Sequence, residues 1–176
     1  MTEPNRSQSI DAAPGRYRLD PQQSRVHYSG KHMFGTGTVH ATFAVREGEV
    51  VLDDTHTLSD ATVVVDAASF ASNSAKRDKD VRSAGLLDVE RYPDIVFTAG
   101  SMEKRDQGWL VPGAVSAHGQ TVPIDLHIDQ LTAEGTGIRL HGSASHLDRT
   151  AFGITGSRGM VGRFLDLEFD AFATPG

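Results

Sequence analysis

Apolar residues occupy every second position in the segments 39–45, 124–129, 138–141 and 165–171. In the second of these, Ile124, Leu126 and Ile128 alternate with two aspartates and a histidine. Successive side chains of a β-strand point to opposite faces of its sheet. The alternation therefore predicts strands with one buried face and one face in water.

Less regular apolar segments predict further strands near 17–20, 25–32, 59–66, 94–101 and 109–117. Turn signals separate the segments, because Gly, Asn and Asp favour the backbone angles of tight turns. They are Glu47-Gly48-Glu49, Asp53-Asp54, Asp106-Gln107-Gly108, His118-Gly119-Gln120 and Glu134-Gly135. The segment from Ser72 to Ala84 is polar and resembles a short helix with Ser72 or Ser74 as its cap.

Each clear strand has one apolar side, which excludes a parallel sheet buried on both faces. About eight such strands can close into a barrel, and closure removes the exposed sheet edges. Two packed sheets are the alternative. The interior of an eight-stranded barrel is either filled by side chains or holds one ligand. The alternation of apolar and polar residues does not distinguish between these two cases.

Composition narrows the function. With 17 Lys and Arg against 23 Asp and Glu, the formal charge is −6, which disfavours nucleic acids and anionic membranes as partners unless a local basic patch exists. The absence of cysteine excludes disulfides, thiol catalysis and thiolate metal sites. Residues 1–14 are polar and predict a disordered tail, and 15–174 predict a single domain.

No apolar segment is long enough for a secretory signal or a membrane span, so we expect a cytoplasmic protein. The eight histidines include no His-x-His pair and no His-Glu-x-x-His motif, so no metal site is predicted. No Gly-x-Ser-x-Gly motif marks a nucleophile. The segment from Gly153 to Gly159 is either a loop between strands or, with Arg158 and Arg163, an anion-binding nest.

Four blocks of the chain resemble one family. They are YRLDP with SRV in 17–26, AKRDKDVRS with LLD and YPDIVF in 75–97, HGQTVPI in 118–124 and DRTAFGI in 148–154. In this order they are similar to the YceI-like family of polyisoprenoid-binding, lipocalin-like proteins. The chain departs from the family pattern at 41–43, 86–87, 115–117 and 163–165, positions where the family lines or closes its pocket.

The resemblance implies an all-β fold, an extended eight-stranded antiparallel lipocalin-like barrel with a short helical insertion. It implies a carrier or sequestering protein that holds a polyprenyl chain, a prenylquinone or another long apolar molecule, without a cofactor and without catalysis. The apolar ligand-binding candidates are Phe43, Ile95, Phe97, Leu126, Phe152 and Phe169.

The family's charged motif residues correspond to Arg77, Asp78 and Arg149. Arg77 and Arg149 would bind a phosphorylated head group, since guanidinium binds phosphate bidentately. The alternative is structural: Arg149 and Asp78 would form an ion pair that fixes the insertion to the barrel. We favour the structural role for Arg149.

Two other functions remain open. The same cavity would suit an enzyme such as a cyclase, which folds a polyene or polyketide into a reactive shape and needs no acid–base motif. A filled core would instead indicate a structural or stress-response protein. An exposed apolar barrel mouth would favour a homodimer.

Overall fold

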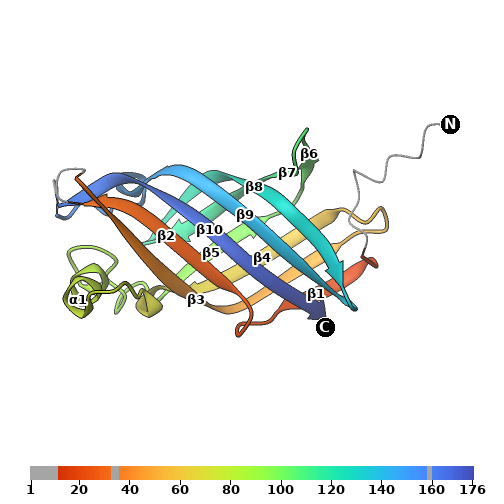
Figure 1. The fold of residues 1–176 in the computed structure, drawn as a ribbon, viewed down its shortest axis with the longest axis horizontal. Helices are drawn as coiled ribbons and strands as arrows, with labels where there is room; N and C mark the ends of the chain where they lie inside the picture. Colours follow the sequence, from red (N-terminus) through yellow and green to blue (C-terminus); the bar gives the residue numbers. More distant parts are fainter. Residues whose placement is uncertain (1–11, 33–35, 158–159) are drawn as a thin grey trace.

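The computed structural model describes residues 12–32, 36–157 and 160–176, which form a β-barrel with one short α-helix (Figure 1). Residues 1–11, most of the expected tail, lie outside the described residues. The strands are β1 Gly15–Leu19, β2 Arg25–His32, β3 Gly37–Leu52, β4 Leu58–Asp66, β5 Asp94–Ala99, β6 Glu103–Lys104, β7 Trp109–Ala117, β8 Gln120–Glu134, β9 Gly137–Asp148 and β10 Val161–Pro175. The helices are α1 Ala75–Arg82 and the 3₁₀ turns η1 Ala67–Ser69 and η2 Arg149–Phe152.

Eight antiparallel strands form a closed ring in the order β10-β2-β3-β4-β5-β7-β8-β9, and β9 pairs back with β10. The ring confirms the barrel and rules out the two-sheet alternative. The short strand β1 pairs with both β10 and β3, so it continues the position of β2 beyond the irregular segment 20–24. β6 pairs only with β7, at the rim.

The expected turn at Glu47-Gly48-Glu49 is wrong, because these residues lie inside the long strand β3. The register between β3 and β4 shifts between Val45 and Glu47, so the strand bends here without ending. Glycine is needed for close approach: a Cβ atom at Gly48 would lie 2.9 Å from Cδ2 of Leu19 in β1. The other four expected turns are correct, with positive φ angles at His118, Gly119 and Gly135 among them.

Alternation sorts the side chains as expected. Ile124, Leu126 and Ile128 of β8 are buried, while the residues between them are exposed. One continuous apolar core runs through the barrel, and a smaller cluster of Ala41, Phe43, Val65 and Phe70 adjoins it beneath η1. The expected helix is also present, and Ser74 is its N-cap.

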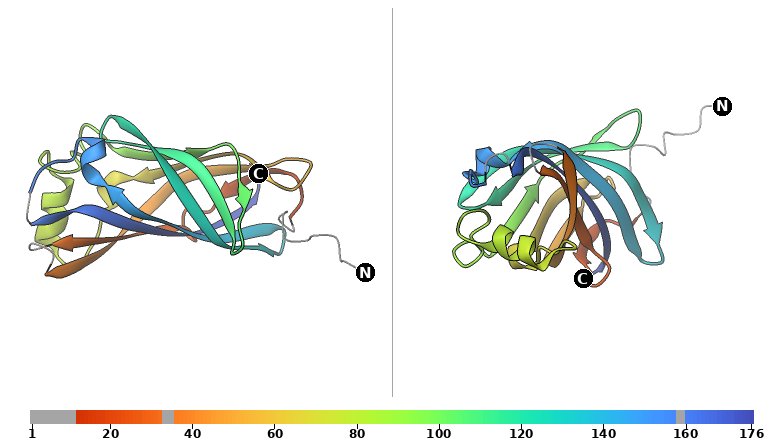
Figure 2. Two further views of the ribbon diagram at one scale, coloured as in Figure 1. Left: turned by 90° about the horizontal axis from the view of Figure 1, so that it is seen from above. Right: turned by 60° about the vertical axis from the view of Figure 1, so that its left-hand side comes forward.

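The two longest connections, after β4 and after β9, leave the barrel at the same end. The described connections at this covered end are 67–93, 118–119 and 149–157. Figure 2 shows α1 and η2 on this end, away from the C-terminus. The described part of the chain holds no helix with the length and apolar character needed to cross a bilayer.

Candidate functional site

An apolar cavity of about 170 Å³ lies inside the barrel. Its walls are almost entirely aliphatic and aromatic, and β3, β4, β5, β7, β8, β9 and β10 all contribute. Cavities of this size lined by Leu, Ile and Phe stay dry and accept apolar guests. The lining residues include Leu19, Val26, Phe43, Val45, Val50, Leu58, Val63, Val65, Ile95, Phe97, Met102, Val111, Val115, Ile124, Leu126, Ile128, Leu131, Ile138, Leu140, Ala144, Leu167 and Phe169.

The lining of the cavity extends along the barrel. On β8 it runs from Ile124 to Leu131. Strand rise and barrel tilt convert that stretch to about 20 Å along the barrel axis. The volume of about 170 Å³ is small beside the roughly 300–1,000 Å³ of typical small-molecule pockets.

Two of the aromatic walls depend on glycines in neighbouring strands. Phe169 of β10 pairs with Gly142 of β9, where a Cβ atom would lie 2.5 Å from Cζ of the ring. Phe97 of β5 similarly lies against Gly113 of β7, where a Cβ atom would be 2.8 Å from Cε2. Any larger residue at either glycine would displace the ring, so the glycines set the shape of the cavity.

Five of the eight expected ligand-binding residues line this cavity: Phe43, Ile95, Phe97, Leu126 and Phe169. Phe152 does not line it. With Leu86 and Ile154, Phe152 packs onto the same core at the covered end. These three buried residues, supplied by the connections after α1 and after β9, are named the plug.

Arg149 lies at the base of the plug and is only 5% exposed. Its guanidinium donates hydrogen bonds to the carbonyl oxygens of Gly162, Ile154 and Val161, at 2.9, 2.9 and 3.1 Å. A buried cation needs such partners because leaving water is costly. Arg149 thus ties the connection after η2 to the start of β10.

The expected ion pair between Arg149 and Asp78 is not formed between these two described residues. Asp78 is buried on α1 and accepts hydrogen bonds from the backbone N–H and the hydroxyl of Ser72, at 2.9 and 2.6 Å. The guanidinium of Arg77 also contacts this loop, and it donates hydrogen bonds to the Ser72 hydroxyl and the Asn73 side-chain oxygen. Both α1 residues therefore organise the loop before the helix.

The Tyr28 ring packs edge-on against Phe70, at 5.6 Å between ring centroids. Burial raises the pKa of the Tyr28 phenol, and the positive charge of Arg149 opposes part of that rise. The phenol is consequently a neutral hydrogen-bonding group at neutral pH.

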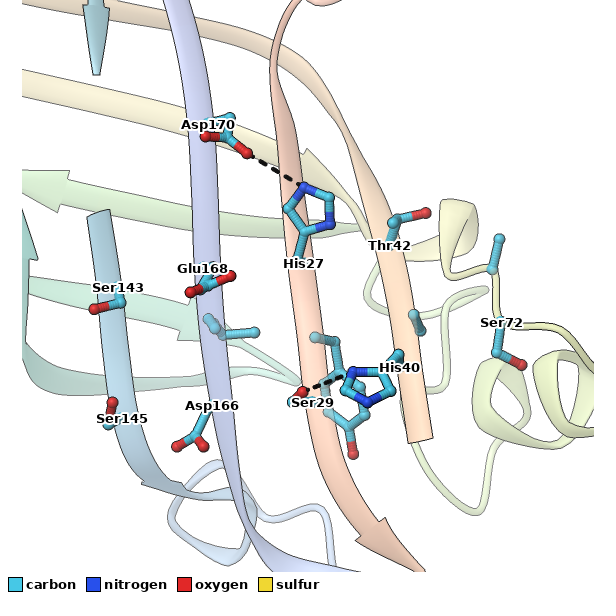
Figure 3. Close-up of a pocket in the computed structure, with 14 residues that line it drawn as sticks. His27, Ser29, His40, Thr42, Ser72, Ser143, Ser145, Asp166, Glu168 and Asp170 are labelled. Atoms are coloured by element: carbon cyan, nitrogen blue, oxygen red, sulfur yellow. Dashed lines mark hydrogen bonds and ion pairs between the residues drawn. The ribbon is translucent and has the colours of Figure 1, made fainter. Parts of the chain in front are cut away.

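A second hollow, about 610 Å³ in volume, lies on the outer surface over β9, β10, β2 and β3. Figure 3 shows its polar lining, with His27 directed to Asp170 at 3.4 Å and Ser29 bonded to Nδ1 of His40 at 3.0 Å. No described carboxylate bonds to His40, so this Ser–His pair lacks the third group of a catalytic triad.

Cross-strand ion pairs continue around the same surface. The Asp129 carboxylate, 2.6 Å from Nδ1 of His141, raises the pKa of that histidine, and His141 in turn lowers the pKa of Asp129. Such pairs stabilise neighbouring strands. Among the described residues, no cluster of three or more His, Cys, Asp or Glu side chains has a geometry that could hold a metal ion.

The family described as YceI-like domain matches residues 17–173. The UPF0312 protein YE1254 of Yersinia enterocolitica is 29% identical over 127 residues, which are 70% of this chain and 65% of that protein. A UPF0312 protein of Yersinia pestis is 28% identical over the same shares. The chain thus spans just under two thirds of the length of these relatives.

Two solved structures share the barrel. BcnA of Burkholderia cenocepacia superposes with a TM-score of 0.76 over 89% of this chain and 99% of that one, at 19% identity. A polyisoprenoid-binding domain from Saccharophagus degradans, implicated in plant cell wall breakdown, gives a TM-score of 0.66 over 91% and 98%, at 13% identity. At these identities the likeness establishes the fold.

Proposed function

The chain belongs to the YceI-like family, and we propose that it binds one linear, apolar isoprenoid-type chain inside the barrel as a carrier or sequestering protein. The observation that supports this most is the apolar cavity lined by Phe43, Phe97, Leu126 and Phe169. The fold shared with a polyisoprenoid-binding domain points in the same direction.

The shape of the cavity favours a binding protein over a cyclase. A cyclase must fold a polyene back on itself so that distant carbons approach each other. A volume of about 170 Å³ leaves little space for a chain folded back on itself, so those carbons stay apart. The strand-borne lining also leaves little room for widening, because neighbouring strands are paired all round the ring.

Burial alone supplies the affinity. Each methylene removed from water contributes about 0.8 kcal/mol before the costs of ordering are subtracted. A chain of about 20 carbons would gain about 6 kcal/mol at the ~0.3 kcal/mol per heavy atom typical of larger ligands, a dissociation constant in the tens of micromolar. A longer chain that extends past the plug would bind more tightly.

Organic extraction and mass spectrometry of the purified protein provide the direct test, followed by titration with a 20-carbon prenyl alcohol. We expect an extracted lipid with a linear isoprenoid or similar chain and saturable binding of the alcohol. A rigid sterol of similar carbon number should bind at least about tenfold more weakly, since its width exceeds that of one chain. Equal binding of the sterol, or conversion of a polyene into cyclic products, would contradict the proposal.

A further inference from the structure

We propose that the covered end docks onto an anionic lipid bilayer, with Met160 and Phe164 entering the interface between water and acyl chains. The inference rests on the proposed function, because a protein that carries a membrane-derived chain must meet the bilayer to load it. Its basis is the placement of charge and of exposed apolar side chains on the molecule.

Charge is distributed unevenly along the barrel axis. The described connections of the covered end contain six Lys or Arg and four Asp or Glu, whereas the rest of the chain has eleven against nineteen. Arg149, Asp78 and Asp88 are buried, which leaves five basic and two acidic side chains nearer the surface. The covered end is therefore basic at its surface although the whole chain carries −6. An anionic surface would attract this end and repel the rest.

The exposed apolar side chains lie at the same end. Met160 and Phe164 are 51% and 39% exposed, and they are the large hydrophobic residues of the described chain that are most open to water. They flank the start of β10, where Val161 pairs with His32 at the end of β2. Phe164 stacks on His146 at 3.9 Å between centroids, which holds its ring at the surface.

Basic side chains lie near these two apolar residues. Arg163, which pairs with Asp148 at 2.9 Å, lies over the Phe164 ring at 5.3 Å, and exposed Lys31 is next to Gly162 across the β2–β10 ladder. Lys76 and Lys79 of α1 are exposed at the same end. Apolar side chains ringed by Lys and Arg are typical of segments that lie in the interface of an anionic membrane. Docking here would place the plug of Leu86, Phe152 and Ile154 next to the lipid.

Co-sedimentation with vesicles tests the docking. The native protein should bind phosphatidylcholine vesicles that contain phosphatidylglycerol and bind pure phosphatidylcholine at least about tenfold more weakly, with binding reduced at high salt. The double variant Met160→Ser/Phe164→Ser should lose binding about tenfold or more. Lys76→Gln/Lys79→Gln should lose about tenfold, whereas Arg18→Gln/Arg105→Gln, which removes the same charge elsewhere, should change binding less than about twofold.

The proposal would be overturned if vesicle binding did not depend on phosphatidylglycerol, or if neither covered-end variant reduced it. It would also be overturned if the covered end bound another protein and no vesicles. Binding of the 20-carbon prenyl alcohol is measured separately in vesicle-free solution. If the alcohol binds and vesicles do not, the docking surface is wrong and the proposed function stands. If vesicles bind and the alcohol does not, the proposed function fails independently.

Discussion

The guanidinium of Arg149 donates through Nη1 to the carbonyl oxygen of Ile154 at 2.9 Å, in a buried position. The Arg149 guanidinium also donates hydrogen bonds to the carbonyl oxygens of Gly162 and Val161. It therefore links the plug residue Ile154 to the first residues of β10. Arg149 therefore acts on the plug through backbone contacts, which supports the structural role over head-group binding.

We expect Arg149→Gln to lower the free energy of unfolding by about 3 kcal/mol or more, because charge-assisted hydrogen bonds are lost and buried carbonyls remain. Urea denaturation followed by Trp109 fluorescence would measure the change. Arg163→Gln is the matched control, because its exposed pair with Asp148 is screened by water and should contribute little to stability. A fully stable Arg149→Gln protein that binds prenyl phosphates poorly and prenyl alcohols normally would make Arg149 a head-group residue instead.

Leu126→Trp should reduce binding of the 20-carbon prenyl alcohol at least about tenfold, because the larger side chain fills the cavity that Leu126 lines. Part of the added volume enters empty space, so the loss of stability should be about 1 kcal/mol. Isothermal titration and thermal unfolding give the two quantities.

The same substitution at Leu52 is the control. Leu52 is 2% exposed and is not among the residues lining the cavity, so Leu52→Trp has no space to fill. It should cost about 1–3 kcal/mol or more by overpacking. Normal binding by Leu126→Trp, with an unchanged melting temperature, would remove Leu126 from the site.

Periodicity predicts the barrel well because burial on one face imposes a two-residue repeat. It predicts the cavity lining less well. In β4 three valines follow one another, and only Val63 and Val65 line the cavity while Val64 faces outward. The alternation is hidden wherever an apolar residue also occupies the outer face. Here the register with Phe97 and Ile95 of β5 decides which valines point inward.

The plug was beyond prediction from local patterns. Phe152 and Leu86 lie in different connections, and they meet only because closure of the ring brings the ends of β4, β5, β9 and β10 together. The same is true of Arg149, whose partners are carbonyl groups that no side-chain motif encodes. The glycines that lie against Phe97 and Phe169 were a usable signal, since glycine within a strand indicates close approach of a neighbour.

The carboxyl of Asp148 should titrate with a pKa of about 2, held low first by Arg163 and then by the hydrogen bonds from Thr150. Because this pKa lies below the value of about 3.9 in an unfolded chain, ionised Asp148 stabilises the fold above about pH 4. That contribution is lost as the pH falls from about 4 towards 2. Carboxyl carbon NMR would follow the titration.

Arg163→Gln should raise the pKa of Asp148, while Asp53 provides an internal control in the same spectra. Asp53 also has a pKa of about 2, but its hydrogen bonds come from Thr55 and Thr57 in the β3–β4 turn. The substitution should leave it unchanged. An unshifted Asp148 in the variant would show that Thr150 alone sets its ionisation.

Phe152→Ala tests whether ligands enter through the covered end. Truncating this buried ring should cost about 3 kcal/mol or more and loosen the plug. Uptake of the 20-carbon prenyl alcohol should then accelerate in stopped-flow measurements, because the remaining plug opens at lower cost. Ile138→Ala is the control, since Ile138 is also buried but lines the cavity at the start of β9, at the opposite end from the plug. Its loss should destabilise the fold comparably without changing the uptake rate.

Equal acceleration in both variants would mean that ligands enter through general loosening of the barrel. An unchanged rate in Phe152→Ala would place access at the opposite end, where Leu58, Met102 and Leu131 are half-buried in the cavity lining.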